Sequence, residues 1–160
     1  MKLGILGSGK IVKEVLPVLS QIENIDVEAI AARNEEKLQK LSKEFNIEKY
    51  YLGIEDLLAD PDIDTVYVAL PNNLHFDAMN KAIDYGKDII CEKPFTSNLF
   101  ETEQIIEKAR DKDVMVVEAI SHRFIPNAIE TKKMISDLGD IKIVSFNYSQ
   151  SVSYTHLRAH

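Results

Sequence analysis

The chain has one cysteine, Cys91, among its 160 residues. A single cysteine cannot form a disulfide within the chain or build a cysteine-based zinc site, so the reducing cytoplasm is the expected compartment. Long apolar runs are also missing, since none approaches the roughly 18 residues that a membrane helix needs. The apolar stretch near the N-terminus covers only Leu3 to Leu6, so we expect neither a signal peptide nor a membrane partner.

The chain also has fewer basic than acidic residues. The 19 Lys and Arg residues are outnumbered by 26 Asp and Glu residues, which gives a net charge of −7. Nonspecific nucleic-acid binding requires a basic surface, so we expect no nucleic-acid partner. Apolar residues (45 %) and charged residues (28 %) have the shares of an ordinary globular protein, and the length suggests one domain and rarely two.

Short apolar runs rich in β-branched residues alternate with stretches of helical spacing. The runs predict strands over residues 2–6, 27–31, 49–52, 65–70, 88–91 and 114–119. The stretches between them predict helices over residues 11–21, 35–45, 55–59, 75–85 and 99–111. Most of the runs are apolar on both faces, which is typical of parallel strands covered by helices on each side. Strand alternating with helix therefore predicts an α/β fold with a doubly wound parallel sheet.

Two residues bear on the helix boundaries. Pro17 lies inside the first predicted helix and should kink or shorten it. Asn34 stands directly before two acidic residues at the start of the second predicted helix, and is a candidate N-cap.

The alternation stops after Ala119. Residues 125–138 predict one more helix, and residues 141–152 alternate well enough for a strand that belongs to no strand–helix–strand repeat. We expect this strand to be the first of a second domain that the chain does not complete. Residues 153–160 break the pattern and resemble the adaptor-derived tails of truncated reading frames, so a non-native tail is expected there; a native disordered tail is the alternative.

A glycine-rich segment, Gly7-Ser8-Gly9, follows the first predicted strand and opens the first predicted helix. Gly7 permits a tight turn, Gly9 lets the backbone approach a pyrophosphate, and the amides of Lys10 and Ile11 face the anion. The third glycine of the G-x-G-x-x-G pattern is missing. Placed after a buried strand, the segment predicts the dinucleotide site of a Rossmann fold, and an ordinary glycine-rich turn is the alternative.

Arg33 stands at the end of the second predicted strand, where a site that prefers NAD usually has Asp or Glu. Arg33, with Lys37 one turn further on, can donate charge-assisted hydrogen bonds to a 2′-phosphate. This arrangement favours NADP as the cofactor, with NAD as a possibility. The alternative is an exposed arginine beside a helix N-terminus.

The strand predicted over residues 65–70 ends in polar and turn-forming residues. Leu70, Pro71 and Asn72 close it on the side where parallel sheets bind ligands, and Asn72 could donate a hydrogen bond to the cofactor. His75 begins the next helix and is a further candidate contact. The alternative for His75 is a local capping or surface role.

Glu92-Lys93-Pro94 ends the next strand on the same side. A charged pair there is costly to desolvate unless a ligand uses it, and Lys93 could donate a proton or hold a substrate hydroxyl. A cis peptide before Pro94 would turn the backbone toward a nicotinamide. A structural Glu92–Lys93 pair is the alternative. Arg123 is a further candidate for contact with cofactor or substrate, and no metal site is predicted.

These segments resemble the Gfo/Idh/MocA family of NAD(P)-dependent oxidoreductases. The resemblance covers residues 1 to about 150 and rests on LGILGSGKI (3–11), VYVALPNNLHFDAMNKAIDYGKDIICEKPF (66–95) and VVEAISHRFIPN (116–127). Within the family, ALPNNLH, CEKP and EAISHRFIP are most similar to the dihydrodiol and xylose dehydrogenase branch, which uses NADP.

The resemblance implies a Rossmann domain followed by a larger α/β domain with an open antiparallel sheet. It also implies hydride transfer between the nicotinamide and a hydroxyl-bearing carbon of a sugar, polyol or cyclic diol. The resemblance also implies that Lys93 contacts substrate and assists proton transfer. It further implies that Asn72 and His75 lie near the nicotinamide and that residues 7–11 form the pyrophosphate loop.

Family members run to roughly twice this length. We therefore expect a nucleotide-binding domain over residues 1–122 and a linking helix with one strand of the second domain over 123–152. We also expect a chain that binds nucleotide without turning over substrate, as part of a parent enzyme that is a homo-oligomer. A non-catalytic, nucleotide-sensing regulatory protein is the alternative.

Overall fold

The computed structural model of the chain describes residues 1–145 and 147. The chain divides into two compact units, Met1–Ile120 and Ser121–His160. Among the described residues, no helix is both long and apolar enough to pass through a bilayer.

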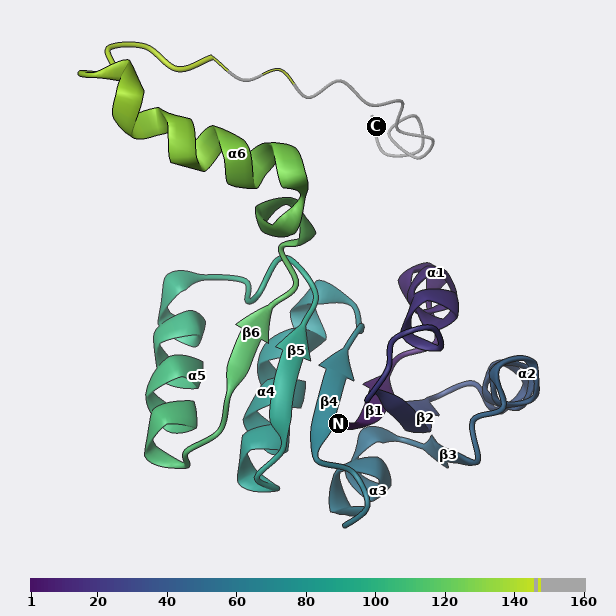
Figure 1. The fold of residues 1–160 in the computed structure, drawn as a ribbon. Helices are drawn as coiled ribbons and strands as arrows, with labels where there is room; N and C mark the ends of the chain where they lie inside the picture. The colour runs from purple at the N-terminus through teal and green to yellow at the C-terminus, as the bar shows by residue number, and fades with distance from the viewer. Residues whose placement is uncertain (146, 148–160) are drawn as a thin grey trace, which may run out of the picture. The chain divides into compact units, whose positions relative to one another are not determined.

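The first unit is built on a six-stranded parallel sheet with the strand order β3-β2-β1-β4-β5-β6 (Figure 1). The strands are β1 (Lys2–Leu6), β2 (Asp26–Ala32), β3 (Lys49–Leu52), β4 (Thr65–Val68), β5 (Asp88–Cys91) and β6 (Val116–Glu118). The chain moves outward from β1 to β3 and then returns to the centre for β4, so the winding direction reverses between β1 and β4. Such a reversal opens a crevice at the carboxyl edge of the sheet. The doubly wound Rossmann fold predicted from the sequence is confirmed.

Helices cover both faces of this sheet. They are α1 (Lys10–Leu19), α2 (Glu35–Phe45), α3 (Ile54–Ala59), α4 (His75–Asp84) and α5 (Leu99–Asp111). Side chains of α1 and α2 form one buried cluster with the sheet, and those of α3, α4 and α5 form another. Strand β1 supplies both clusters, with Leu3 and Ile5 on one face and Leu6 on the other. Full burial of a leucine or isoleucine stabilises the fold by about 1.5–3 kcal/mol.

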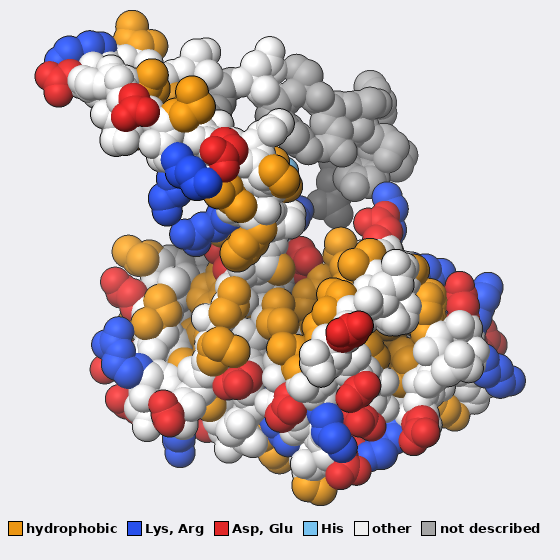
Figure 2. Space-filling model, viewed as in Figure 1, with side chains coloured by type: hydrophobic (Ala, Val, Ile, Leu, Met, Phe, Trp, Pro, Cys, Tyr) orange, Lys and Arg blue, Asp and Glu red, His pale blue; other side chains and the backbone are white. Residues whose placement is uncertain are grey.

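One part of the sheet is left open. Val116 packs on the cluster of α4 and α5, so its neighbours Met115 and Val117 point to the other face, where they are 53 % and 41 % exposed. Hydrophobic side chains are visible over β5 and β6 in Figure 2. Helices α1 and α2 therefore cover the β1–β3 half of their face and leave the β5–β6 half uncovered within this unit.

The helix boundaries agree closely with the sequence pattern. Helix α1 continues through Pro17 and ends two residues later, where the backbone N–H of Ser20 donates to the carbonyl of Leu16. The helix thus ends two residues before the predicted end at residue 21. The Asn34 side chain accepts the backbone N–H of Lys37 at 2.9 Å and caps α2 as predicted.

A buried polar cluster lies at the amino edge of the sheet, opposite the crevice. The Asp60 carboxylate accepts hydrogen bonds from the Lys49 ammonium (2.8 Å), the Tyr51 hydroxyl (2.8 Å) and the backbone N–H of Asp62 (2.9 Å). Buried Lys87 donates to two backbone carbonyls of the same loop, at 2.8 and 2.7 Å. The bond from Lys49 is the main cause that lowers the pKa of Asp60 to about 2. This cluster fastens the loop before β4 to β3 and β5.

The second unit contains η2 (Ser121–Phe124), α6 (Pro126–Met134) and η3 (Ile135–Leu138). The helix predicted over residues 125–138 is therefore an α-helix only as far as Met134 and continues as a 3-10 helix. Residues 141–145 and 147 form no helix or strand. The rest of the strand predicted over 141–152, and the tail predicted over 153–160, lie outside the described residues.

Candidate functional site

A cavity of about 740 Å³ lies at the carboxyl edge of the sheet, between the loops that follow β1, β2, β3 and β4. This volume is within the range of small-molecule and cofactor sites, roughly 300–1,000 Å³. Several of the predicted site residues line it together: Gly7, Ser8, Gly9, Arg33, Lys37, Leu70 and Pro71. The winding reversal therefore brings the ends of separate strands around one space, as the sequence pattern predicts.

The glycine loop forms one end of the cavity. Gly7 has φ +127°, and a Cβ built on it would collide with the Ala69 carbonyl, with the carbonyl carbon 3.0 Å away. Its N–H donates to the Ala31 carbonyl at 2.8 Å, which holds the loop between β2 and β4. Only glycine fits there, because the conformation and the close backbone approach both exclude a side chain.

Gly9 has a different role from Gly7. It is exposed, its φ of −78° is ordinary, and a Cβ built on it meets no heavy atom within 4 Å. Gly9 also precedes α1, a helix with no side-chain cap and no acidic residue in its first turn. The first backbone N–H groups of α1 are therefore free to donate to a ligand acceptor. Because Gly9 has no side chain, such an acceptor has room beside the cavity.

Arg33 and Lys37 line another part of the cavity, and both are exposed. No hydrogen bond or ion pair holds the Arg33 guanidinium within the part of the chain that the structure describes. The last residue of β2, Ala32, and the two residues after it, Arg33 and Asn34, include no carboxylate that could accept ribose hydroxyls. These two cations suit a phosphate group better than a neutral diol.

One wall of the cavity, formed by Gly53, Glu55, Asp77 and Lys81, is not predicted from the sequence. The Lys81 ammonium donates to the Glu55 carboxylate and joins α4 to α3. This hydrogen bond raises the pKa of Lys81 and lowers that of Glu55. One signal for this wall was present, because Gly53 directly follows β3, just as Gly7 and Arg33 follow β1 and β2.

The remaining predicted residues do not line this cavity: Lys10, Ile11, Asn72, His75, Glu92, Lys93, Pro94 and Arg123. Lys10 forms an ion pair with Glu14 at 3.5 Å, and Ile11 packs on the α1–α2 cluster. Asn72 is exposed at the start of the short helix η1 (Asn72–Leu74). Arg123 belongs to η2 in the second unit.

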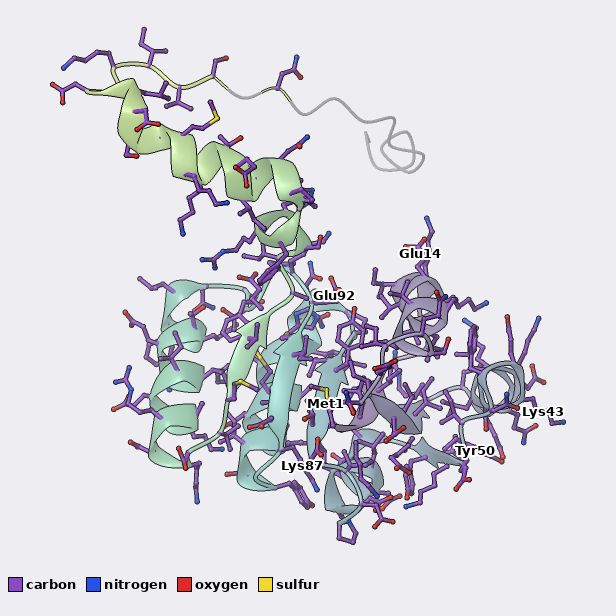
Figure 3. The ribbon with its side chains drawn as sticks, in the orientation of Figure 1. Met1, Glu14, Lys43, Tyr50, Lys87 and Glu92 are labelled. Atoms are coloured by element: carbon purple, nitrogen blue, oxygen red, sulfur yellow. The ribbon has the colours of Figure 1, made fainter. Side chains whose placement is uncertain are left out.

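Glu92 and Lys93 follow β5, whose two ends are marked by Lys87 and Glu92 in Figure 3. The Glu92 carboxylate accepts the Tyr67 hydroxyl at 2.5 Å and the backbone N–H of Lys93 at 3.3 Å. Burial and this hydrogen bond raise the pKa of Tyr67 far above its usual range. No ion pair joins the side chains of Glu92 and Lys93 among the described residues, so the structural pair considered as an alternative is not formed. The Lys93 side chain is exposed, and the peptide bond before Pro94 is cis.

His75 is fully buried, which differs from a surface or capping role. One ring nitrogen lies 2.9 Å from the Leu70 carbonyl oxygen, and the other lies 2.9 Å from the Pro94 carbonyl oxygen. Both nitrogens thus face the backbone, and neither is directed to the cavity. Cys91, next to Glu92, is also buried, and desolvation raises the pKa of its thiol to about 12. It is a core residue, as the sequence indicates.

Comparison with known proteins gives consistent results. A family model described as an oxidoreductase family with an NAD-binding Rossmann fold, GFO_IDH_MocA, matches residues 1–120. A trans-1,2-dihydrobenzene-1,2-diol dehydrogenase of Xenopus tropicalis is 35 % identical over 155 residues, covering 94 % of this chain and 47 % of the relative. A D-xylose 1-dehydrogenase (NADP(+)) of Haloferax volcanii is 37 % identical over 151 residues, covering 93 % and 46 %.

A solved structure is similar as well. It is KijD10, a 3-ketoreductase from Actinomadura kijaniata in complex with NADP and TDP-benzene, with a TM-score of 0.81 and 27 % identity. The match covers 86 % of this chain and 42 % of that protein. The chain thus spans about half the length of the curated relatives it matches.

Proposed function

The chain belongs to the Gfo/Idh/MocA family of oxidoreductases with an NAD-binding Rossmann fold, and on that premise we propose that it is the nucleotide-binding part of an NADP-dependent dehydrogenase. One observation carries the proposal: the glycine loop, Arg33 and Lys37 line the same cavity. The glycine loop and the first amides of α1 would hold the pyrophosphate, and Arg33 and Lys37 would hold the 2′-phosphate. The NADP named for the xylose dehydrogenase relative and bound in KijD10 supports the same choice.

The residues of this site fit the cofactor in two respects. The space beside Gly9 is free of heavy atoms within 4 Å of a Cβ position, so a pyrophosphate could approach the backbone there. The end of β2 is followed by the cation Arg33 and not by a carboxylate. A carboxylate at this position would repel a 2′-phosphate. When bound, NADP would supply the hydride-carrying nicotinamide.

Lys93 is our candidate catalytic residue. Its side chain is exposed at the carboxyl edge and does not form an ion pair with Glu92. An ammonium in this position could hold a substrate hydroxyl and exchange its proton during hydride transfer. By similarity to the dihydrodiol and xylose dehydrogenases, the substrate of the parent enzyme would be a sugar, polyol or cyclic diol.

We further propose that residues 1–160 alone bind nucleotide and turn over no substrate. The curated relatives are about twice as long, with 47 % and 46 % of their lengths matched, and their remaining halves would supply the other substrate contacts. An assay of substrate-dependent NADPH formation should give no rate for this chain. A measurable rate would show that the chain carries a complete active site.

A fluorescence titration with NADPH and NADH tests the cofactor assignment. The wild-type chain should bind NADPH more tightly than NADH. Arg33→Ala should weaken NADPH binding about tenfold, because a charge-assisted contact is lost, and leave NADH binding nearly unchanged. Lys43→Ala is the matched control, since it removes a positive charge from the outer end of α2 (Figure 3), away from the cavity. Tighter binding of NADH by the wild-type chain would remove Arg33 from the site.

A further inference from the structure

The backbone around Lys93 is held by residues from two other elements. The Pro94 carbonyl oxygen lies 2.9 Å from a ring nitrogen of His75, at the start of α4. The backbone N–H of Phe95 donates to the Glu118 carboxylate, at the end of β6, at 3.0 Å. We infer that His75 and Glu118 are positioning residues, which fix the segment 93–95 and so present Lys93 to the ligand before the ligand binds.

His75 joins this segment to the wall of the cavity. Its other ring nitrogen lies 2.9 Å from the carbonyl oxygen of Leu70, a residue that lines the cavity. The ring is fully buried, and a neutral imidazole has a single N–H, so it donates to one of these two carbonyls at a time. Both loops thus contact this one side chain, and removing it takes a hydrogen-bond donor away from them. The sequence predicts that His75 contacts the cofactor, whereas in the structure its ring nitrogens contact the two backbone carbonyls.

Glu118 contacts the segment from β6, the strand that pairs with β5 on the side away from β4. Its register is fixed by the sheet, because Glu118 pairs with Cys91 and the next backbone N–H, of Ala119, donates to the Cys91 carbonyl. The carboxylate thus lies beside the turn that follows β5, and its bond to Phe95 is charge-assisted and stronger than a neutral one. Among the described residues, the Glu118 carboxylate forms no other hydrogen bond and no ion pair.

Fixing the segment would lower the cost of binding. A side chain on a mobile loop must lose conformational freedom when it meets a ligand, whereas one on an ordered backbone has less to lose. The inference rests on the proposed function, because it requires the nicotinamide half of NADPH to reach Lys93. The adenine half would occupy the cavity, which Lys93, His75 and Glu118 do not line. A substitution that frees the 93–95 segment should therefore weaken mainly the binding of the nicotinamide half of NADPH.

The test compares two ligands by calorimetry: NADPH, and 2′,5′-ADP, which lacks the nicotinamide half. Glu118→Ala should weaken NADPH binding about fivefold, the equivalent of one hydrogen bond, and leave 2′,5′-ADP binding nearly unchanged. Glu118→Gln keeps an acceptor oxygen and should retain wild-type binding of both ligands. His75→Leu should also weaken NADPH binding more than 2′,5′-ADP binding, with some loss for both ligands because His75 also contacts the Leu70 carbonyl at the cavity. Ile83→Val, a core change on the same helix as His75, is the control for lost stability and should show no split.

Amide hydrogen exchange gives a second readout that does not depend on binding. Exchange at Phe95 should become faster in Glu118→Ala than in Glu118→Gln, while the amides of β5 stay protected. Equal weakening of both ligands, or unchanged binding and exchange in a folded Glu118→Ala, would overturn the inference. Failure of the wild-type chain to bind either ligand would instead overturn the proposed function, and the inference with it.

Discussion

The two glycines of the nucleotide loop should respond in opposite ways to the same substitution. Gly7 combines φ +127° with a backbone carbonyl where its Cβ would stand, whereas Gly9 has an ordinary φ and open space. Gly7→Ala therefore disturbs the fold itself. Gly9→Ala leaves the fold intact and places a methyl group where a pyrophosphate would approach the backbone.

The magnitudes follow from these geometries. An alanine in the conformation of Gly7 costs about 1–3 kcal/mol for the backbone, and the collision with the Ala69 carbonyl adds about 1–3 kcal/mol. We expect Gly7→Ala to lower the free energy of unfolding by about 3 kcal/mol, a large share of the 5–15 kcal/mol typical of a domain. Gly9→Ala should change it by less than about 1 kcal/mol, with a small gain if the unfolded chain loses freedom.

Urea denaturation followed by circular dichroism measures the first effect, and NADPH titration measures the second. Gly9→Ala should keep the wild-type midpoint and bind NADPH at least about tenfold more weakly. A Gly7→Ala chain as stable as wild type would refute the close approach of β1 and β4 at this loop. A Gly9→Ala chain that binds NADPH normally would refute the assignment of the pyrophosphate to this position.

Three further predictions concern buried polar groups. The pKa of Asp60, about 2 in the folded state against an ordinary 3.8, means that the carboxylate stabilises the fold above about pH 4 and that this stabilisation is lost as the pH falls toward 2. The free energy of unfolding, measured by urea denaturation, should fall over this range by at most about 2 kcal/mol, and less in Asp60→Asn. Tyr67→Phe removes the only hydroxyl donor to Glu92 among the described contacts and should cost about 1–2 kcal/mol at pH 7 by the same assay, with an unchanged midpoint as the contrary result. Cys91, buried and with its pKa raised to about 12, should resist alkylation by iodoacetamide at pH 8 until urea unfolds the chain; rapid labelling of the native chain would contradict its burial.

The sequence predicts most of the fold because the signals are local. Most strands of the sheet coincide with short apolar runs. The helices coincide with the stretches between these runs, in which apolar residues recur at helical spacing. The errors are at strand ends. The strand from Thr65 stops at Val68, since the chain then turns to line the cavity, and the edge strand β6 keeps only Val116–Glu118 of the predicted 114–119 because one neighbour pairs with it.

Most of the correctly predicted cavity residues adjoin the end of a strand, and Lys37 lies one helical turn beyond Arg33. Gly7 and Arg33 are recognisable because they follow apolar runs directly. Glu55 and Lys81 resemble solvated helix residues in the sequence, and only the packing of α3 beside α4 brings them to the cavity. The burial of His75 is equally hidden, because its partners are backbone carbonyls 5 and 19 residues away, which no side-chain pattern reveals.

The Asp60 cluster and the cavity lie at opposite edges of one sheet, which has a practical consequence for redesign. Lys49, Lys87 and Asp60 fasten the amino edge without lining the cavity, and the loop after β2 lines the cavity without touching that cluster. Substitutions at such separated places tend to add independently. The loop carrying Arg33 could therefore be exchanged to change cofactor choice, while losses of stability from that exchange are compensated by reinforcing the amino edge.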